Sequence, residues 1–186
     1  MPKEQAKSKS KQYTMKQFLR DILEVVVPAI ILYLIISTFF LQSREVPSAS
    51  MVPTIEEHDR FLLNKTAYWF QKPERFDIVV FMPPPAAGSK IAFVKRIIGL
   101  PGETIKISQG VVYIDNKPLD EPYIRPDRTP DYEFGPYIIP DGQVFVLGDN
   151  RRNSHDSHVW GPLPLKNIEG HAWWRYWPVD RMMILK

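Results

Sequence analysis

The sequence has no cysteine among its 186 residues. This absence excludes a disulfide framework, a thiol nucleophile and a metal site with cysteine ligands. Histidine is scarce as well, with four residues, and none stands in a familiar serine-protease histidine motif. A serine nucleophile in this chain would therefore need a base other than histidine.

The chain also lacks internal repeats and low-complexity segments, and its composition of 44% hydrophobic and 24% charged residues suits one packed domain. Proline is abundant, with 18 residues. Because proline interrupts helix interiors, this number predicts a body rich in strands and loops rather than a helical bundle.

Positive charge is concentrated in one place. Residues 1–20 contain six basic side chains and one acidic one, a net charge of +5, whereas the whole chain carries +3. The rest of the chain therefore has a slight negative excess. A body without matching positive charge argues against a nucleic-acid partner, and we interpret residues 1–21 as a basic cytoplasmic tail.

A long apolar run follows this tail, and residues 25–41 contain no charged side chain. We predict a single transmembrane anchor over residues 22–42, close to the 20 or so residues that cross a bilayer. A buried core helix would show a polar face, and a cleaved signal peptide would be shorter and closed by a small-x-small site. The lysines before the run place the N-terminus in the cytoplasm, so residues 43–186 would lie on the exported side of the cell membrane.

Beyond the anchor, short β-branched and aromatic segments alternate with turn residues. Strands are predicted by this pattern over residues 59–64, 76–81, 91–98, 104–108, 111–114 and 143–147. Residues 120–142 are rich in proline and aspartate, so we expect an irregular insertion near 106–140. The predicted fold is mostly β, an antiparallel β-sheet body behind one N-terminal transmembrane helix.

The first segment with possible chemistry is a Ser-x-Ser pair, Ser48 and Ser50. In an extended segment these side chains point the same way. One hydroxyl could attack a carbonyl while the other donates a hydrogen bond to the developing oxyanion. The ordinary alternative is a solvated loop.

Lys95 is the candidate base. By strand alternation it shares a face with Phe93 and Ile97. A lysine acts as a base only when neutral, so its pKa must fall from about 10.4 to about 7, which burial among apolar groups can achieve. The alternative is a lysine on a sheet edge that reaches into water.

The densest polar cluster is the segment 148–158. An Asx-type turn would explain part of it. Beyond that, Ser154 could hydrogen-bond a lysine amine and orient it. Asp156 could pair with Arg96 and hold this loop on the strand that carries Lys95.

Together these segments resemble a known family. Residues 48–54, 75–81, 95–103 and 148–157 are similar, in this order and behind a membrane anchor, to the sequence boxes of type I signal peptidases. The resemblance covers the anchor and most of residues 44–165, and it is looser over 106–140.

The resemblance implies roles for individual residues. Ser50 corresponds to the nucleophile and Lys95 to the general base. Ser48, with the backbone amide of Ser50, corresponds to the oxyanion hole. Ser154 corresponds to the serine that holds the lysine amine.

Further positions correspond to supporting residues. Asp156 corresponds to the acid that supports the site through Arg96, Gly148 to a glycine close to the lysine, and Met51 to the substrate face. His158 stands where the family usually has an arginine, which implies a weaker ion pair at neutral pH.

The implied activity is that of a membrane-bound serine endopeptidase that removes signal peptides through an acyl-enzyme. Neither a metal nor another cofactor is expected. The expected partners are pre-proteins with small residues at the first and third positions before the cut, and membrane lipid. Two alternatives stay open, namely an organelle inner-membrane peptidase of the same clan and a non-enzymatic, membrane-anchored binding protein.

Overall fold

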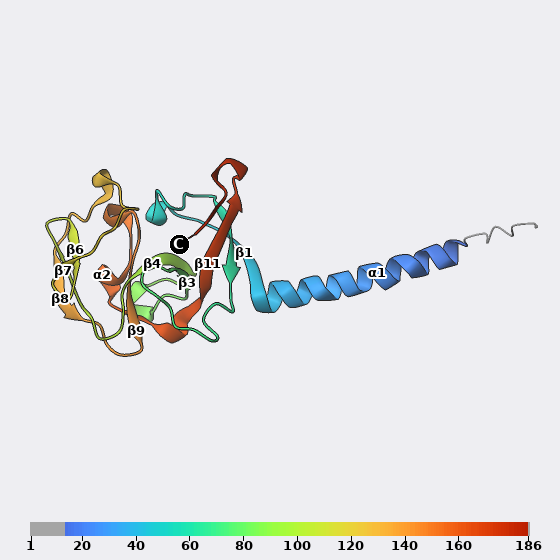
Figure 1. Ribbon diagram of the computed structural model, residues 1–186, viewed down its shortest axis with the longest axis horizontal. Coiled ribbons are helices and arrows are strands. Elements are labelled where there is room, and N and C mark those ends of the chain that lie inside the picture. Colours follow the sequence, from blue (N-terminus) through green and yellow to red (C-terminus); the bar gives the residue numbers. More distant parts are fainter. Residues whose placement is uncertain (1–13, 186) are drawn as a thin grey trace, which may run out of the picture. The chain divides into compact units, whose positions relative to one another are not determined.

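The computed structural model describes residues 14–185 of the chain, which divides into two units between Thr38 and Phe39 (Figure 1). Residues 1–13 of the predicted basic tail lie outside the described residues. The first unit is helical and the second contains all the strands. The unit boundary falls a few residues before the predicted end of the anchor.

The first unit contains the helix α1, Met15–Ile35, and a π-helical turn over Ile36–Phe40 continues the helix across the unit boundary. Its side chains are exposed, and the stretch from Met15 to Phe40 is long and apolar enough to cross a membrane. The helix begins earlier than residue 22 because Thr14 and Gln17 form a reciprocal capping box. The cap, and not the apolar run, therefore sets its start.

The second unit is built around an eight-stranded sheet. Its strands are β1 (Leu41–Glu45), β2 (Arg60–Asn64), β3 (Ile78–Phe81), β4 (Phe93–Gly99), β9 (Gln143–Leu147), β10 (Leu163–Pro164), β11 (Ile168–Trp177) and β12 (Met183–Ile184). The order is β1-β2-β11-β3-β4-β9-β10, with β12 added on β11, and every pair is antiparallel. The predicted antiparallel, mostly β fold is confirmed.

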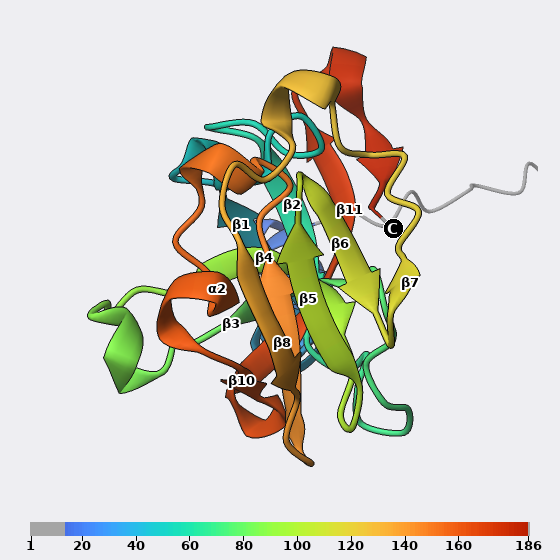
Figure 2. The same cartoon turned by 90° about the vertical axis from the view of Figure 1, so that its left-hand side faces the viewer.

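A second, four-stranded sheet corrects the expected irregular insertion. Its strands are β5 (Thr104–Ser108), β6 (Val111–Ile114), β7 (Lys117–Pro118) and β8 (Phe134–Ile138), in the order β7-β6-β5-β8 (Figure 2). Strand β8 contains Gly135-Pro136, which reads as a turn in sequence. It is tolerated because β8 is an edge strand, where proline removes no ladder hydrogen bond from a central position.

Short helical turns connect the strands. They are the 3-10 turns η2 (Ala49–Met51), η3 (Pro85–Ala87), η4 (Pro126–Arg128), η5 (Arg151–Asn153), η6 (Leu165–Asn167) and η7 (Val179–Arg181), and the short helix α2 (Ser157–Trp160). Of these, η2 and η5 flank the site described below.

The two sheets share one apolar core. Ile98, Phe145 and Leu147 of the large sheet form a buried cluster with residues of β5 and β6, including Ile105 and Ile107. Phe93 and Ile97 point to the opposite face of β4 from Ile98, and they belong to another apolar cluster. The second sheet therefore covers one face of β4, and Lys95 lies on the other face.

Candidate active site

Ser50 lies in the 3-10 turn η2, which follows β1 closely in the chain. The predicted extended segment is therefore only partly correct, because Ser48 is extended whereas Ala49–Met51 turns. The two hydroxyls nevertheless meet, with 3.3 Å between Ser48 Oγ and Ser50 Oγ. Ser50 is only 8% exposed, whereas Ser48 is exposed, so a solvated loop does not describe the position of Ser50.

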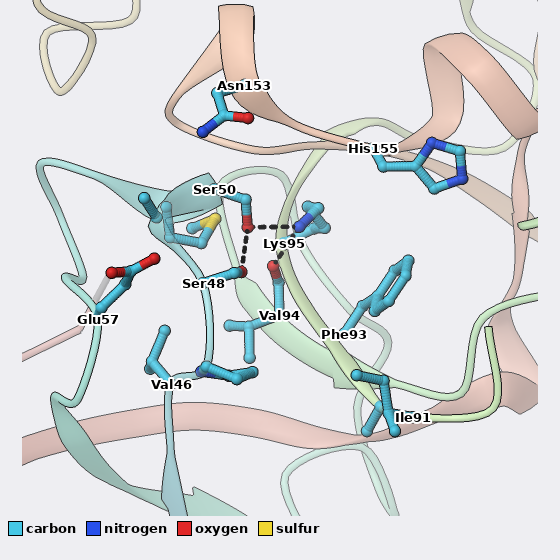
Figure 3. Close-up of a pocket in the computed structure, with 14 residues that line it drawn as sticks. Val46, Ser48, Ser50, Glu57, Ile91, Phe93, Val94, Lys95, Asn153 and His155 are labelled. Atoms are coloured by element: carbon cyan, nitrogen blue, oxygen red, sulfur yellow. Dashed lines mark hydrogen bonds between the residues drawn. The ribbon is translucent and has the colours of Figure 1, made fainter.

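Lys95 reaches Ser50 from the middle of the large sheet. Strand β4 lies between β3 and β9, and Lys95 is 4% exposed. Its ammonium group donates to Ser50 Oγ at 2.7 Å and to the Val94 carbonyl at 3.1 Å (Figure 3). The alternative of a solvated edge lysine is therefore excluded, and the hydroxyl and the amine stand within the hydrogen-bond reach that a nucleophile and its base require.

Burial lowers the pKa of Lys95 to about 8. Burial is the larger influence because desolvation disfavours the ammonium form, while the negative charges of Asp156 and Asp149 partly counteract it. A substantial fraction of this lysine is therefore neutral at mildly alkaline pH, as a general base requires.

Arg96, the next residue, supports the site from the other face of β4, although not through the expected acid. It makes a two-pronged pair with Asp149, Nε to Oδ1 at 2.9 Å and Nη2 to Oδ2 at 2.8 Å, and both side chains are buried. Thr54 Oγ1 donates to Asp149 Oδ2 at 2.5 Å. We predicted that Arg96 pairs with Asp156, and this prediction was wrong. The turn after β9 instead aims Asp149 at the Arg96 guanidinium.

Asp156 supports the loop in a different way. Its Oδ2 accepts from the Gly148 amide at 2.9 Å, and its Oδ1 lies 2.6 Å from His158 Nδ1. The His158 ring stacks on Tyr132 with 4.0 Å between ring centroids. His158 therefore contacts Asp156 at the position where the family usually has an arginine. The ring of Tyr132 holds the orientation of the His158 ring.

Ser154 and Gly148 are in contact beside Ser50. A Cβ built on Gly148 would overlap Ser154 Oγ and the Ser50 carbonyl, so only glycine fits here. The Ser154 hydroxyl is buried and has no hydrogen-bond partner among residues 14–185. Its predicted bond to the Lys95 amine is not formed in this structure, and that role stays a prediction.

A pocket of about 380 Å³ opens at Ser50 and Lys95. Its walls are mainly apolar, and they come from the segments 46–51 and 91–95. Met51 contributes to the lining and is fully buried, and its part in the substrate face stays a prediction. Asn153 and His155 from the opposite loop and Glu57 complete the lining (Figure 3).

Sequence reasoning missed several residues that hold this geometry. Asn150 donates from its backbone nitrogen to the Ser50 carbonyl and from its side-chain Nδ2 to the Ala49 carbonyl, each at 3.0 Å. Arg151 is buried and pairs with Glu121. The dense polar cluster at 148–158 was the signal for Asn150, whereas nothing in the sequence pointed to Glu121.

The fold and the site define a class of protein. A buried serine hydroxyl in contact with a desolvated lysine amine, beside an apolar pocket on an antiparallel β body, is the arrangement of a serine hydrolase with a lysine base. Residues 19–177 match the family model described as "Signal peptidase, peptidase S26". The chain therefore belongs to the peptidase S26 family of signal peptidases.

Individual relatives are similar over most of the chain. Signal peptidase I of Leptolyngbya laminosa is 46% identical, with 83% of this chain and 77% of that protein covered. Signal peptidase I S of Bacillus subtilis is 35% identical, with coverages of 94% and 97%. Thylakoidal processing peptidase 1 of Arabidopsis thaliana is 38% identical over 76% of this chain, which spans 43% of that protein.

Proposed function

We propose that this protein is a membrane-anchored endopeptidase that removes signal peptides from exported pre-proteins, with Ser50 as nucleophile and Lys95 as general base. The observation that carries the proposal is the 2.7 Å contact between Lys95 Nζ and Ser50 Oγ inside a buried environment. Membership of the signal peptidase family supports the substrate class.

The proposed reaction is acyl transfer. Neutral Lys95 accepts the Ser50 proton while Ser50 Oγ attacks the scissile carbonyl, and the carbonyl oxygen takes the negative charge. The Ser50 amide and the Ser48 hydroxyl donate to this oxyanion. Protonated Lys95 then gives its proton to the leaving amine, which leaves an acyl-enzyme. Water, activated by the same amine, releases the acyl group and restores Ser50.

The pocket supports the proposed substrate preference. It lies between two chain segments, 46–51 and 91–95, that could both contact an extended peptide. Apolar side chains such as Val46, Ala92 and Phe93 line it, and at about 380 Å³ it is small among ligand pockets. Small residues at the first and third positions before the cut would fit such a pocket.

Cleavage of a pre-protein by the full-length chain in detergent tests the proposal. Ser50→Ala should lower kcat by at least about 1,000-fold, because the variant keeps only binding and the oxyanion donors. Ser108→Ala, in the second sheet, is the matched control and should keep wild-type activity. Full activity of Ser50→Ala would exclude the mechanism, and an inactive wild type would favour the binding-protein alternative.

For the membrane arrangement, we propose that α1 spans the cell membrane with the N-terminus in the cytoplasm. The apolar stretch Met15–Phe40 and the excess of lysine before it support this orientation. In intact spheroplasts, external protease should then degrade residues 39–186 and spare an N-terminal tag. Protection of the body instead would reverse the orientation.

Exposed aromatic residues of the second unit support an additional contact with lipid. Trp69 is 58% exposed, Phe70 97% and Trp173 42%, and such side chains favour the headgroup region. In vesicles with brominated acyl chains, replacing Trp69, Trp173 and Trp177, which is 52% exposed, by Phe should remove most fluorescence quenching. Trp160→Phe is the control because Trp160 is buried. Equal quenching in all variants would contradict the contact.

A further inference from the structure

We propose that Asn150, itself fixed by Arg128, is a positioning residue that orients the peptide group between Ala49 and Ser50. This inference rests on the proposed function, because the N–H of that peptide group is the backbone donor assigned to the oxyanion. Neither Asn150 nor Arg128 contacts the scissile bond in this scheme. Both act through the nucleophile turn η2.

Asn150 donates hydrogen bonds to two consecutive carbonyls of the turn. Its Nδ2 donates to Ala49 O at 3.0 Å, and its backbone amide donates to Ser50 O at 3.0 Å. Ala49 O also accepts the weaker turn bond from Val52 N at 3.2 Å. Asn150 is 1% exposed, so no bulk water competes for these bonds.

A peptide group is planar, so fixing its carbonyl fixes the direction of its N–H. Ala49 O and Ser50 N belong to the same peptide group. The Nδ2 bond to Ala49 O therefore aims the Ser50 N–H, and it also polarises that N–H, because hydrogen bonds through one amide strengthen each other. An oxyanion donor must be held before the charge develops if it is to stabilise it fully.

Arg128 determines which end of the Asn150 amide faces the turn. Its Nη1 donates to Asn150 Oδ1 at 3.0 Å, and a guanidinium can only donate. The amide oxygen is therefore held by Arg128, and the amide nitrogen must point to Ala49 O. Arg128 belongs to η4, in the connection between β7 and β8 of the second sheet, so this sheet contributes to the site through one side chain.

Steady-state cleavage of a pre-protein by the full-length enzyme tests the chain of contacts. In Asn150→Asp the donor to Ala49 O becomes an acceptor of the same shape, and kcat should fall about 100-fold, the usual effect of a lost oxyanion donor. KM should stay within about twofold, because the ground-state carbonyl gains little from the hole. Arg128→Met should lower kcat by about tenfold, and Arg128→Lys, which keeps a donor, should restore part of this loss.

A double-mutant cycle separates positioning from general support. If Arg128 acts through Asn150, Arg128→Met should cost nothing further in an Asn150→Ala background. Additive losses in kcat would overturn the coupling. Lys117→Met is the control because Lys117 is exposed in β7 of the second sheet; it should leave kcat unchanged.

Two further outcomes keep this inference distinct from the proposed function. If Ser50→Ala stays active, the proposed function fails and this inference fails with it. If Ser50→Ala is inactive while Asn150→Asp and Arg128→Met keep wild-type kcat, only this inference is wrong. Arg128 is partly exposed, so its variants should fold even where a change at the buried Asn150 lowers the melting temperature.

Discussion

Strands β4 and β5 each carry one lysine, and the two lysines have different environments. Lys95 follows Val94 and lies on a face with Phe93 and Ile97, and it is 4% exposed. Lys106 stands between Ile105 and Ile107, which are buried, and is itself exposed. By strand alternation Lys106 shares its face with Thr104 and Ser108 rather than with hydrophobic residues, so the local pattern already differs between the two strands.

The difference comes from what covers each strand. Strand β4 is central in the large sheet, and both of its faces are packed, one by the second sheet and the other by the site loops. Strand β5 lies in a four-stranded sheet whose inner face alone joins the shared cluster. Alternation predicts which residues share a face with each lysine, whereas the desolvation of Lys95 comes from the elements that cover that face.

The strongest way to break this comparison is to remove each amine. Lys95→Met should lower kcat for pre-protein cleavage by at least about 1,000-fold, because no other base reaches Ser50 Oγ in the described structure. It should not lower the melting temperature, since an apolar side chain suits this buried site better than an amine. Steady-state kinetics and thermal unfolding measure both effects.

Lys106→Met is the matched control, and it should change neither kcat nor the melting temperature appreciably, because exposed substitutions usually have small effects. Equal losses of activity in the two variants would show that the covering of β4 is irrelevant to the chemistry.

The next prediction tests the close backbone contact at Gly148 beside Ser50. In Gly148→Ala the new Cβ would overlap Ser154 Oγ and Ser50 O, so the nucleophile turn must move. We expect kcat to fall by about 100-fold and the stability to fall by about 1–3 kcal/mol. Gly102→Ala, with open space but a φ of +85°, should lose about 1–2 kcal/mol from backbone strain and keep its kcat. Similar kcat values in both variants would contradict the close-contact argument.

The variant Ser154→Ala tests whether the site retains a buried hydroxyl that lowers the stability of the folded state. A buried hydroxyl without a partner destabilises the folded state, so its presence suggests a role that needs it. Ser154→Ala should keep or raise the melting temperature, while kcat falls by about 10-fold to 100-fold if the hydroxyl turns to the Lys95 amine during the reaction. Unchanged kcat would leave Ser154 with no part in orienting the lysine.

Much of the fold was predictable because its signals are local. The apolar run and the β-branched segments predicted the helix and six of the twelve strands in the described residues, namely β2, β3, β4, β5, β6 and β9. The ten-residue strand β11 and the strands β1, β7, β10 and β12 were missed. Strand β8 was missed because Gly135-Pro136 has the local signature of a turn. Only the pairing of β8 with β5 makes it a strand, and this pairing joins segments about 30 residues apart.

The site was predictable at the level of residue types and less so at the level of partners. Ser50 and Lys95 were named from a hydroxyl pair and an apolar strand, and the structure brings them together. The partner of Arg96 was misassigned, because Asp149 and Asp156 stand in one polar segment and only the turn after β9 decides which acid faces β4. Which acid of a loop meets a given arginine depends on backbone direction, which the order of residues does not specify.

The subtlest test concerns the charge on Lys95. A base is active only when deprotonated, and the pKa of Lys95 is lowered to about 8, so kcat/KM should rise with pH and level off above about 8. The carboxylate of Asp156 favours the ammonium form. Asp156→Asn should therefore lower the pKa of Lys95 further and move the rise in kcat/KM to lower pH.

Asp141→Asn is the control for this shift, because Asp141 is exposed and does not contribute to the pKa of Lys95. Its profile should coincide with that of the wild type. A rise that moves to higher pH in Asp156→Asn would mean that burial of the amine was relaxed by the change. Covering by the site loops, more than the nearby acids, would then set the difference between Lys95 and Lys106.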